Sequence, residues 1–142
     1  TGHVLKVTGS GTTAWGAVTS VGTLSALDVT GAITAGSLVA PIAINAQTGT
    51  TYTFVAADAG KLITSSNGSA QTITIPPNSS VAFAIGTQIM VQNIGSANAT
   101  LAQGSGVTIQ SKDSAKQIDG QFAAATCIKT ATDTWTLIGA LA

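Results

Sequence analysis

Residues 21–38, VGTLSALDVTGAITAGSL, alternate apolar residues with small polar ones, and they include one charged side chain and no aromatic ring. This alternation is typical of a β-strand, because successive side chains of a strand point to opposite faces. Ordering one residue costs about 1–2 kcal/mol, whereas burying a Val, Leu or Ile returns about 1.5–3 kcal/mol. Large aliphatic residues are too sparse here for a lone strand to do better than break even. The segment therefore needs an apolar face supplied by other chains.

The whole chain of 142 residues also carries few charges. Charged residues make up 7% of it and apolar residues 44%, and the formal net charge is zero. A typical domain has about 25% charged residues. A monomer of this size needs a hydrated, charged surface, whereas disordered chains combine high charge with low hydrophobicity. We therefore expect an ordered chain whose surface is largely covered by other copies.

The large aliphatic residues of the first region are the ones we expect to form an interior shared between copies. They are Leu24, Leu27, Val29, Ile33 and Leu38. Small residues between them let backbones approach closely, and cyclic symmetry would close such an assembly. The sequence therefore predicts an extended, intertwined β segment over residues 1–48 that serves for oligomerisation or anchoring.

Residues 49–142 hold denser strand patterns separated by turn residues. The expected strands are 51–54, 61–65, 71–75, 88–93, 99–103, 107–111, 124–130 and 134–139. Asn67-Gly68 predicts a hairpin between the second and third of these, and Pro76-Pro77 ends the third. Short strands with turns at this spacing are typical of an antiparallel β-sandwich or small barrel. The predicted fold class is thus all-β, with this second domain following the extended segment.

Two sets of motifs resemble those of bacteriophage structural proteins. TGHVLKVTGSGTTAWGAVTSVGTLSALDVTGAITAGSL is similar to shaft-like segments of phage tail fibres and related virion fibre proteins, particularly of marine phages. ADAGKLI, TIPPNSSVAF, GSGVTI and the closing WTLIG are similar to a C-terminal β-domain of phage tail and minor structural proteins. Together the two resemblances cover nearly the whole chain.

The resemblance implies a homotrimeric structural protein of the virion, assembled in the host cytoplasm and in contact with other virion proteins. It also implies a part in host attachment. The chain holds only about one copy of the shaft repeat, so no long slender shaft can be built from it. A short fibre, a terminal fragment and a protein that decorates capsid or tail all remain open.

Residues suited to catalysis are few and dispersed. His3 is the only histidine and lies near a terminus, and Cys127 is the only cysteine, in the strand-like run AATCIKT. Glycoside cleavage needs two carboxylates about 5–9.5 Å apart, which Asp58 with Asp133 or Asp119 could supply. Asp58 and Asp133 also fit turn positions that bond to nearby backbone groups. We expect no enzyme, catalytic residue, cofactor or metal site.

Binding to a host surface is the alternative function. Fibre tips use loops on a rigid β-scaffold to recognise glycans or proteins. Three polar loops are candidates, and from them we take Asn67, Asn98 and Lys112 as possible receptor contacts. The aromatic residues Tyr52 and Trp135 lie on alternating strand positions, where core packing is the simpler interpretation.

Two further partner classes are not expected. The five lysines are scattered and the chain has no arginine, so it lacks the basic patch that nucleic-acid binding requires. No apolar run approaches the ~18 residues of a membrane span, so we expect no insertion into a bilayer.

Overall fold

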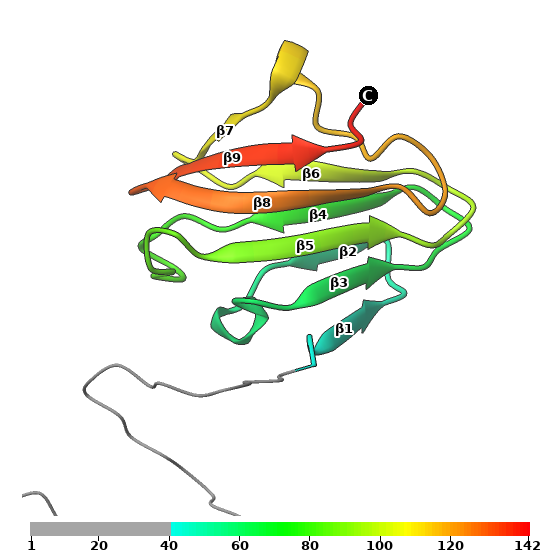
Figure 1. Ribbon diagram of the computed structural model, residues 1–142, viewed down its shortest axis with the longest axis horizontal. Helices are drawn as coiled ribbons and strands as arrows, with labels where there is room; N and C mark the ends of the chain where they lie inside the picture. The colour runs from blue at the N-terminus through cyan, green and yellow to red at the C-terminus, as the bar shows by residue number, and fades with distance from the viewer. Residues whose placement is uncertain (1–40) are drawn as a thin grey trace, which may run out of the picture. The chain divides into compact units, whose positions relative to one another are not determined.

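The computed structural model describes residues 41–142, which form strands joined by short turns (Figure 1). The strands are β1 (Ile44–Gln47), β2 (Thr51–Thr53), β3 (Leu62–Ser65), β4 (Gln71–Ile75), β5 (Gln88–Asn93), β6 (Ala99–Gln103), β7 (Thr108–Gln110), β8 (Ala124–Ala131) and β9 (Thr134–Gly139). Two short 3-10 turns, η1 (Ala56–Asp58) and η2 (Lys112–Ser114), are the only helical elements among the described residues. The predicted β-rich fold is confirmed.

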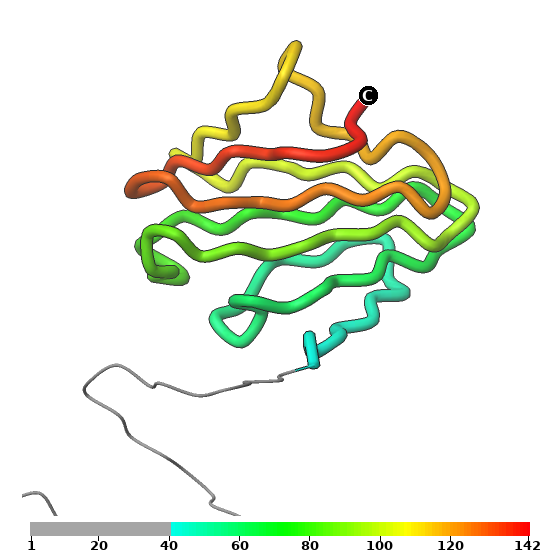
Figure 2. Tube along the Cα trace, in the orientation of Figure 1, coloured from blue at the N-terminus to red at the C-terminus, as the bar shows by residue number. Residues whose placement is uncertain are grey.

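The strands form two sheets, and the chain passes repeatedly from one to the other. The six-stranded sheet has the order β1-β3-β5-β8-β9-β7, and the three-stranded sheet has the order β2-β4-β6. Each of the pairs β1–β2, β3–β4 and β5–β6 therefore places one strand in each sheet, and we call each pair a rung. Figure 2 shows the chain winding through the three rungs before it reverses at β8. This winding is like that of a short β-solenoid.

The rungs stack with parallel strands, so the prediction of an antiparallel domain is wrong. Five of the seven strand pairings are parallel, and only β5–β8 and β8–β9 are antiparallel. The hairpin predicted at Asn67-Gly68 is also wrong, because β3 and β4 lie in different sheets. A two-residue hairpin of this kind needs positive φ at both central residues, and neither Asn67 nor Gly68 has it. The turn instead carries the chain across to the other sheet.

The stack ends at the third rung, where both sheets change to antiparallel partners. β5 pairs with β8 on one side and with β3 on the other. The outer edge of β6 is bordered by the segment around Gln117, which forms an antiparallel bridge to Thr100. The Leu101 N–H donates to the Lys116 carbonyl, and the Ile118 N–H donates to the Ala99 carbonyl, each at 2.8 Å. The C-terminal segments therefore cover this end of the winding.

The hydrophobic core lies between the two sheets. It includes Phe54, Ile63, Ile73, Ile75, Ile89, Val91, Leu101, Ile118, Cys127, Trp135 and Leu137, each at most 3% exposed. These side chains come from alternate strand positions, as the period of two requires. The expected core role of Trp135 is therefore confirmed, and Tyr52 is partly buried beside this core.

The outer face of the three-stranded sheet is polar and regular. Thr51, Thr72 and Thr100 stand in one row across the strands, and Thr53, Thr74 and Ala102 stand in the next. Threonine is favoured on exposed strand positions because its branched side chain suits a pleated surface. This face is the solvated side of the domain.

The expected interface residues Leu24, Leu27, Val29, Ile33 and Leu38 lie outside the described residues. Ile44–Gln47, placed in the N-terminal segment by the sequence, form β1 and pair in parallel with β3.

Candidate functional site

The turns that follow β1, β3 and β5 stack on one another at one end of the rungs (Figure 1). Asn67 lies in the middle turn, where its Nδ2 donates to the Thr48 carbonyl at 2.6 Å and its Oδ1 accepts from the Ser69 N–H at 2.7 Å. Its own carbonyl accepts from the Ala97 N–H at 3.2 Å. Asn67 thus joins all three turns, and its amide is used within the fold.

This stacking requires a glycine in the third turn. A Cβ on Gly95 would lie 2.4 Å from the backbone nitrogen of Asn67 and 2.5 Å from its carbonyl oxygen. The buried Asn93 supports the same turn, because its Oδ1 accepts from the Gly95 N–H and its Nδ2 donates to the Ala97 carbonyl at 2.9 Å. We call this end of the rungs, formed by the turns after β1, β3 and β5, the turn end. Its backbone is held in one arrangement by these hydrogen bonds, so it is a preorganised surface.

Two of the three predicted receptor residues lie at this end. Asn98 is exposed, and its carbonyl accepts from the Gln71 N–H at 2.9 Å. Asn67 is partly buried with a committed side chain, so Asn98 is the better candidate for an external contact. Lys112 lies elsewhere, in η2, and lines a pocket to which no residue of these turns contributes.

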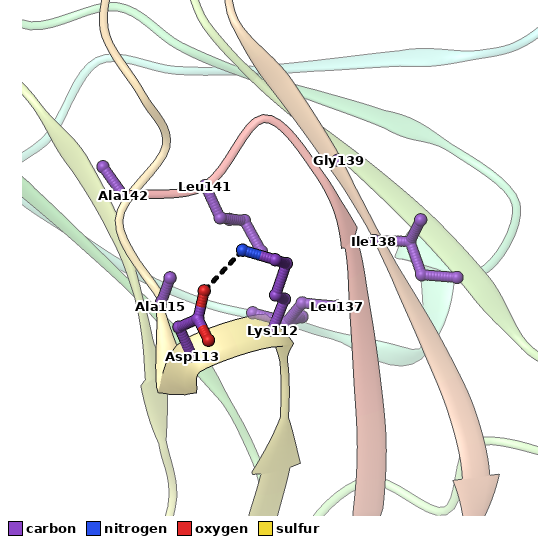
Figure 3. A pocket seen from close by; sticks show the side chains of 8 residues that line it. All are labelled: Lys112, Asp113, Ala115, Leu137, Ile138, Gly139, Leu141 and Ala142. Atoms are coloured by element: carbon purple, nitrogen blue, oxygen red, sulfur yellow. Dashed lines mark hydrogen bonds and ion pairs between the residues drawn. The ribbon is translucent and has the colours of Figure 1, made fainter.

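The pocket beside Lys112 has a volume of about 570 Å³ and lies against the end of β9. Figure 3 shows Lys112, Asp113 and Leu141 on one side of β9 and Ile138 on the other. Lys112 and Asp113 form an ion pair, but their side chains are 91% and 78% exposed. Pockets of this volume can hold a small ligand. An ion pair this exposed contributes little energy, so it leaves the pocket without a fixed polar anchor.

An apolar row crosses the outer face of the six-stranded sheet, opposite the core. The strand register places Ile44, Leu62, Met90, Thr126 and Ile138 side by side on five neighbouring strands. We call this set the apolar row. Ile44 is 65% exposed and Ile138 is 58% exposed. The rows on either side are uncharged too, with Ala46, Thr64, Gln92 and Ala124 on one and Gln88, Ile128 and Thr136 on the other. Four members of the row are apolar and the fifth is Thr126, so the row is an exposed, largely apolar strip of the kind that suits an interaction surface.

A buried carboxylate organises the first rung. Asp58 is fully buried and accepts from the Asn45 amide at 2.8 Å, the Tyr52 hydroxyl at 2.6 Å and the Val55 N–H at 2.9 Å. Burial, together with the neighbouring Asp58, raises the pKa of Tyr52 from 10.0 to about 12. Gln47 also donates to Asn45, at 2.7 Å. The carboxylate bonds go to β1, to β2 and to the residue before η1, so the cluster joins the first rung to the turn that follows it.

A buried lysine organises the opposite side of the core. Lys129 on β8 is 2% exposed, and its Nζ donates to Asn78 Oδ1 at 2.5 Å and to the Phe83 carbonyl at 2.7 Å. The Asn78 N–H in turn donates to Asp133 Oδ1 at 2.6 Å. These bonds attach the long connection between β4 and β5 to the β8–β9 turn.

The other groups considered for chemistry have structural partners or are sealed in the core. Asp133 adopts a positive φ of 53° in the β8–β9 turn, as a turn residue does. Burial raises the pKa of the Cys127 thiol from 9.0 to about 12, so the thiolate is disfavoured. Within residues 41–142, no three His, Cys, Asp or Glu side chains are grouped as metal ligands would be. The same residues include no helix with the length and hydropathy of a membrane span.

No protein-family model, curated protein or solved structure matches this chain. The resemblance to phage fibre proteins stays a prediction from the sequence motifs.

Sequence reasoning missed the apolar row and the Lys129 cluster. The apolar row could not be found from the sequence, because its members are outward-facing residues that become neighbours only through the strand pairing. The predicted pairing of these strands was wrong. The position of Lys129 could have been recognised from the sequence. It lies two residues after Cys127 in the strand ATCIKT, so its side chain points to the same inward face. A lysine at a core position needs a hydrogen-bonding partner, and that requirement points to a buried polar cluster.

Proposed function

We propose that this chain is a structural component of a bacteriophage virion, a homotrimeric tail fibre or similar appendage that contributes to host attachment. The sequence motifs support this function, and so does the low charge of the whole chain. In this proposal the N-terminal segment before β1 joins the copies, and the β domain, which includes β1, is the rigid body that it carries.

The observation that carries the proposal is the apolar row. An uncharged strip across five strands is unfavourable in contact with water, and it can be buried against another uncharged surface without desolvating a charge. Sister copies or neighbouring virion proteins of similar composition are suitable partners. The row begins at Ile44 of β1, near the start of the described residues.

Native mass spectrometry of the full chain, with sedimentation velocity, tests the assembly. We expect a trimer that persists on dilution, because burial shared among copies couples unfolding to dissociation. A stable monomer across the accessible concentration range would contradict the structural function.

The location in a virion needs a separate measurement. Peptide mass spectrometry of gradient-purified phage particles should detect the tryptic segment 7–61 at a constant ratio to other structural proteins. Recovery of this segment only in the unassembled fraction would argue against a virion component.

A second candidate function is a receptor- or glycan-binding tip, or a module that decorates the capsid. The preorganised turn end favours it, because exposed Asn, Ser and Gly residues on a rigid scaffold suit hydrogen bonding to sugar hydroxyls. Glycan-array binding by the full chain should fall on Asn98→Ala and be unchanged on Thr72→Ala, which lies on the outer face of the three-stranded sheet. Absence of binding to any host envelope fraction would exclude this candidate.

A further inference from the structure

Lys129 has an unusual set of partners for a buried cation. Its Nζ is held between the side-chain oxygen of Asn78 at 2.5 Å and the carbonyl of Phe83 at 2.7 Å, and the residue is 2% exposed. The ion pair found among residues 41–142 is Lys112–Asp113, so no carboxylate of these residues lies within salt-bridge distance of Lys129. A buried ammonium with neutral partners alone is costly, because carbonyl dipoles replace its hydration incompletely.

Aromatic packing lies beside the buried Lys129, and a hydrogen bond to the Asn78 backbone holds Asn78 in place. The ring of Phe83 packs edge-on against Trp135, with ring centroids 5.5 Å apart. Trp135 is opposite Lys129 in the β8–β9 register. Asn78 is fixed from its other side, because its N–H donates to Asp133 Oδ1 at 2.6 Å. A buried amine and a partly buried carboxamide are therefore held in contact, with a carboxylate bonded to the backbone of the residue that carries the carboxamide.

We propose that Lys129 and Asn78 form an intramolecular isopeptide bond. The ammonium of Lys129 first gives up one proton, and the Nζ lone pair then adds to Cγ of Asn78. The new Nζ–Cγ bond forms as the Cγ–Nδ2 bond breaks, and Nδ2 leaves as ammonia. The ammonia takes up the released proton, so one ammonium ion is lost and no oxidant or reductant is needed.

Two features of the site favour this reaction. A desolvated lysine amine is a competent nucleophile toward carbonyl carbon, and holding both groups in one geometry replaces a bimolecular encounter. The product removes the buried charge and keeps one N–H on Nζ, which can still donate to the Phe83 carbonyl. Asp133 acts here as a positioning residue through the backbone of Asn78.

Intact-mass spectrometry of the folded full chain tests the proposal. We expect a mass lower than that encoded by one ammonia. The chain has no arginine, so trypsin cleaves it only after lysine. Digestion should therefore yield segment 62–112 covalently linked to segment 117–142, because the modified Lys129 is no longer cleaved. Lys129→Met and Asn78→Ala should each restore the full mass, and Lys112→Arg, at an exposed lysine, should leave the loss in place. Asn78→Asp should lose one water instead.

Two results would overturn the proposal. The first is the full encoded mass in a folded, wild-type chain after prolonged incubation, which needs no variant to fold. The second is loss of ammonia that maps to Asn67-Gly68, where a succinimide changes the mass identically but leaves cleavage after Lys129 intact.

Discussion

The hydroxyl of Tyr52 donates a 2.6 Å hydrogen bond to Asp58, a carboxylate that is fully buried beneath the first rung. Asn45 of the neighbouring β1 strand donates to both of these residues. Asn45, Tyr52 and Asp58 lie in β1, β2 and η1 respectively. Their hydrogen bonds therefore connect the first rung to the turn that leads to the second rung.

Tyr52→Phe should lower the free energy of unfolding by about 1.5–3 kcal/mol, the usual worth of a hydrogen bond to a charged group. The phenyl ring keeps the packing against Phe54 and removes only the hydroxyl. Chemical denaturation of the full chain measures the change, with Thr51→Ala, on the exposed face of the same strand, as a control within about 0.5 kcal/mol of wild type. Equal stability of the two variants would mean that the Asp58 cluster does not hold the rung.

Stability should fall in alkaline solution as Tyr52 and Cys127 ionise. Burial raises both pKa values to about 12 in the fold, from ordinary values of 10.0 and 9.0. Between these limits the folded state binds more protons than the unfolded state, so the stabilisation is complete below about pH 9 and is lost toward pH 12. Denaturation midpoints measured across this range should fall less steeply in Tyr52→Phe with Cys127→Ala. An unchanged slope would assign the effect to other groups.

Gly95→Ala should destabilise the domain by about 1–3 kcal/mol, because the added methyl group meets the Asn67 backbone, which cannot move aside as a side chain would. Gly68→Ala is the matched control in the adjacent turn, since its Cβ would meet only Ser96 Oγ at 3.9 Å. Thermal unfolding of both variants measures the difference. Equal melting temperatures would show that the turns are not stacked as described.

Ile138→Lys should weaken association of the copies, because it places a charge at one end of the apolar row. The same substitution at Thr72, on the outer face of the three-stranded sheet, should leave association unchanged. Sedimentation velocity over a dilution series measures both, and circular dichroism checks that each variant folds. A trimer that tolerates Ile138→Lys and dissociates with Thr72→Lys would place the interface on the opposite sheet.

Local sequence patterns predicted the strands well but not their partners. The strands at 71–75, 88–93 and 99–103 have the predicted bounds, because buried apolar residues recur at every second position in each of them. Pairing depends on where the chain goes between strands, and the Asn67-Gly68 turn satisfies a hairpin rule that the fold does not use. The three rungs begin at residues 44, 62 and 88, and this unequal spacing hides the repeat.

The candidate site residues show the same contrast between local features, which the sequence predicts, and contacts between distant residues, which it does not. Asn67 and Asn98 were found as polar turn residues, but only the stacking of turns shows that the first is committed to the fold. Lys112 was chosen for its exposed, polar loop, and it lines a pocket formed by C-terminal residues far along the chain. The Lys129 cluster joins residues separated by 51 positions, a distance over which sequence patterns give no information.

The reversal of the chain at β8 limits how this architecture can vary in length. Because β5 already carries β8 along one edge, an additional parallel turn cannot be appended after it without displacing the terminal hairpin. Duplication or loss of a turn is therefore confined to the portion before Gln88. Longer versions should differ there by whole windings while retaining the closing hairpin unchanged.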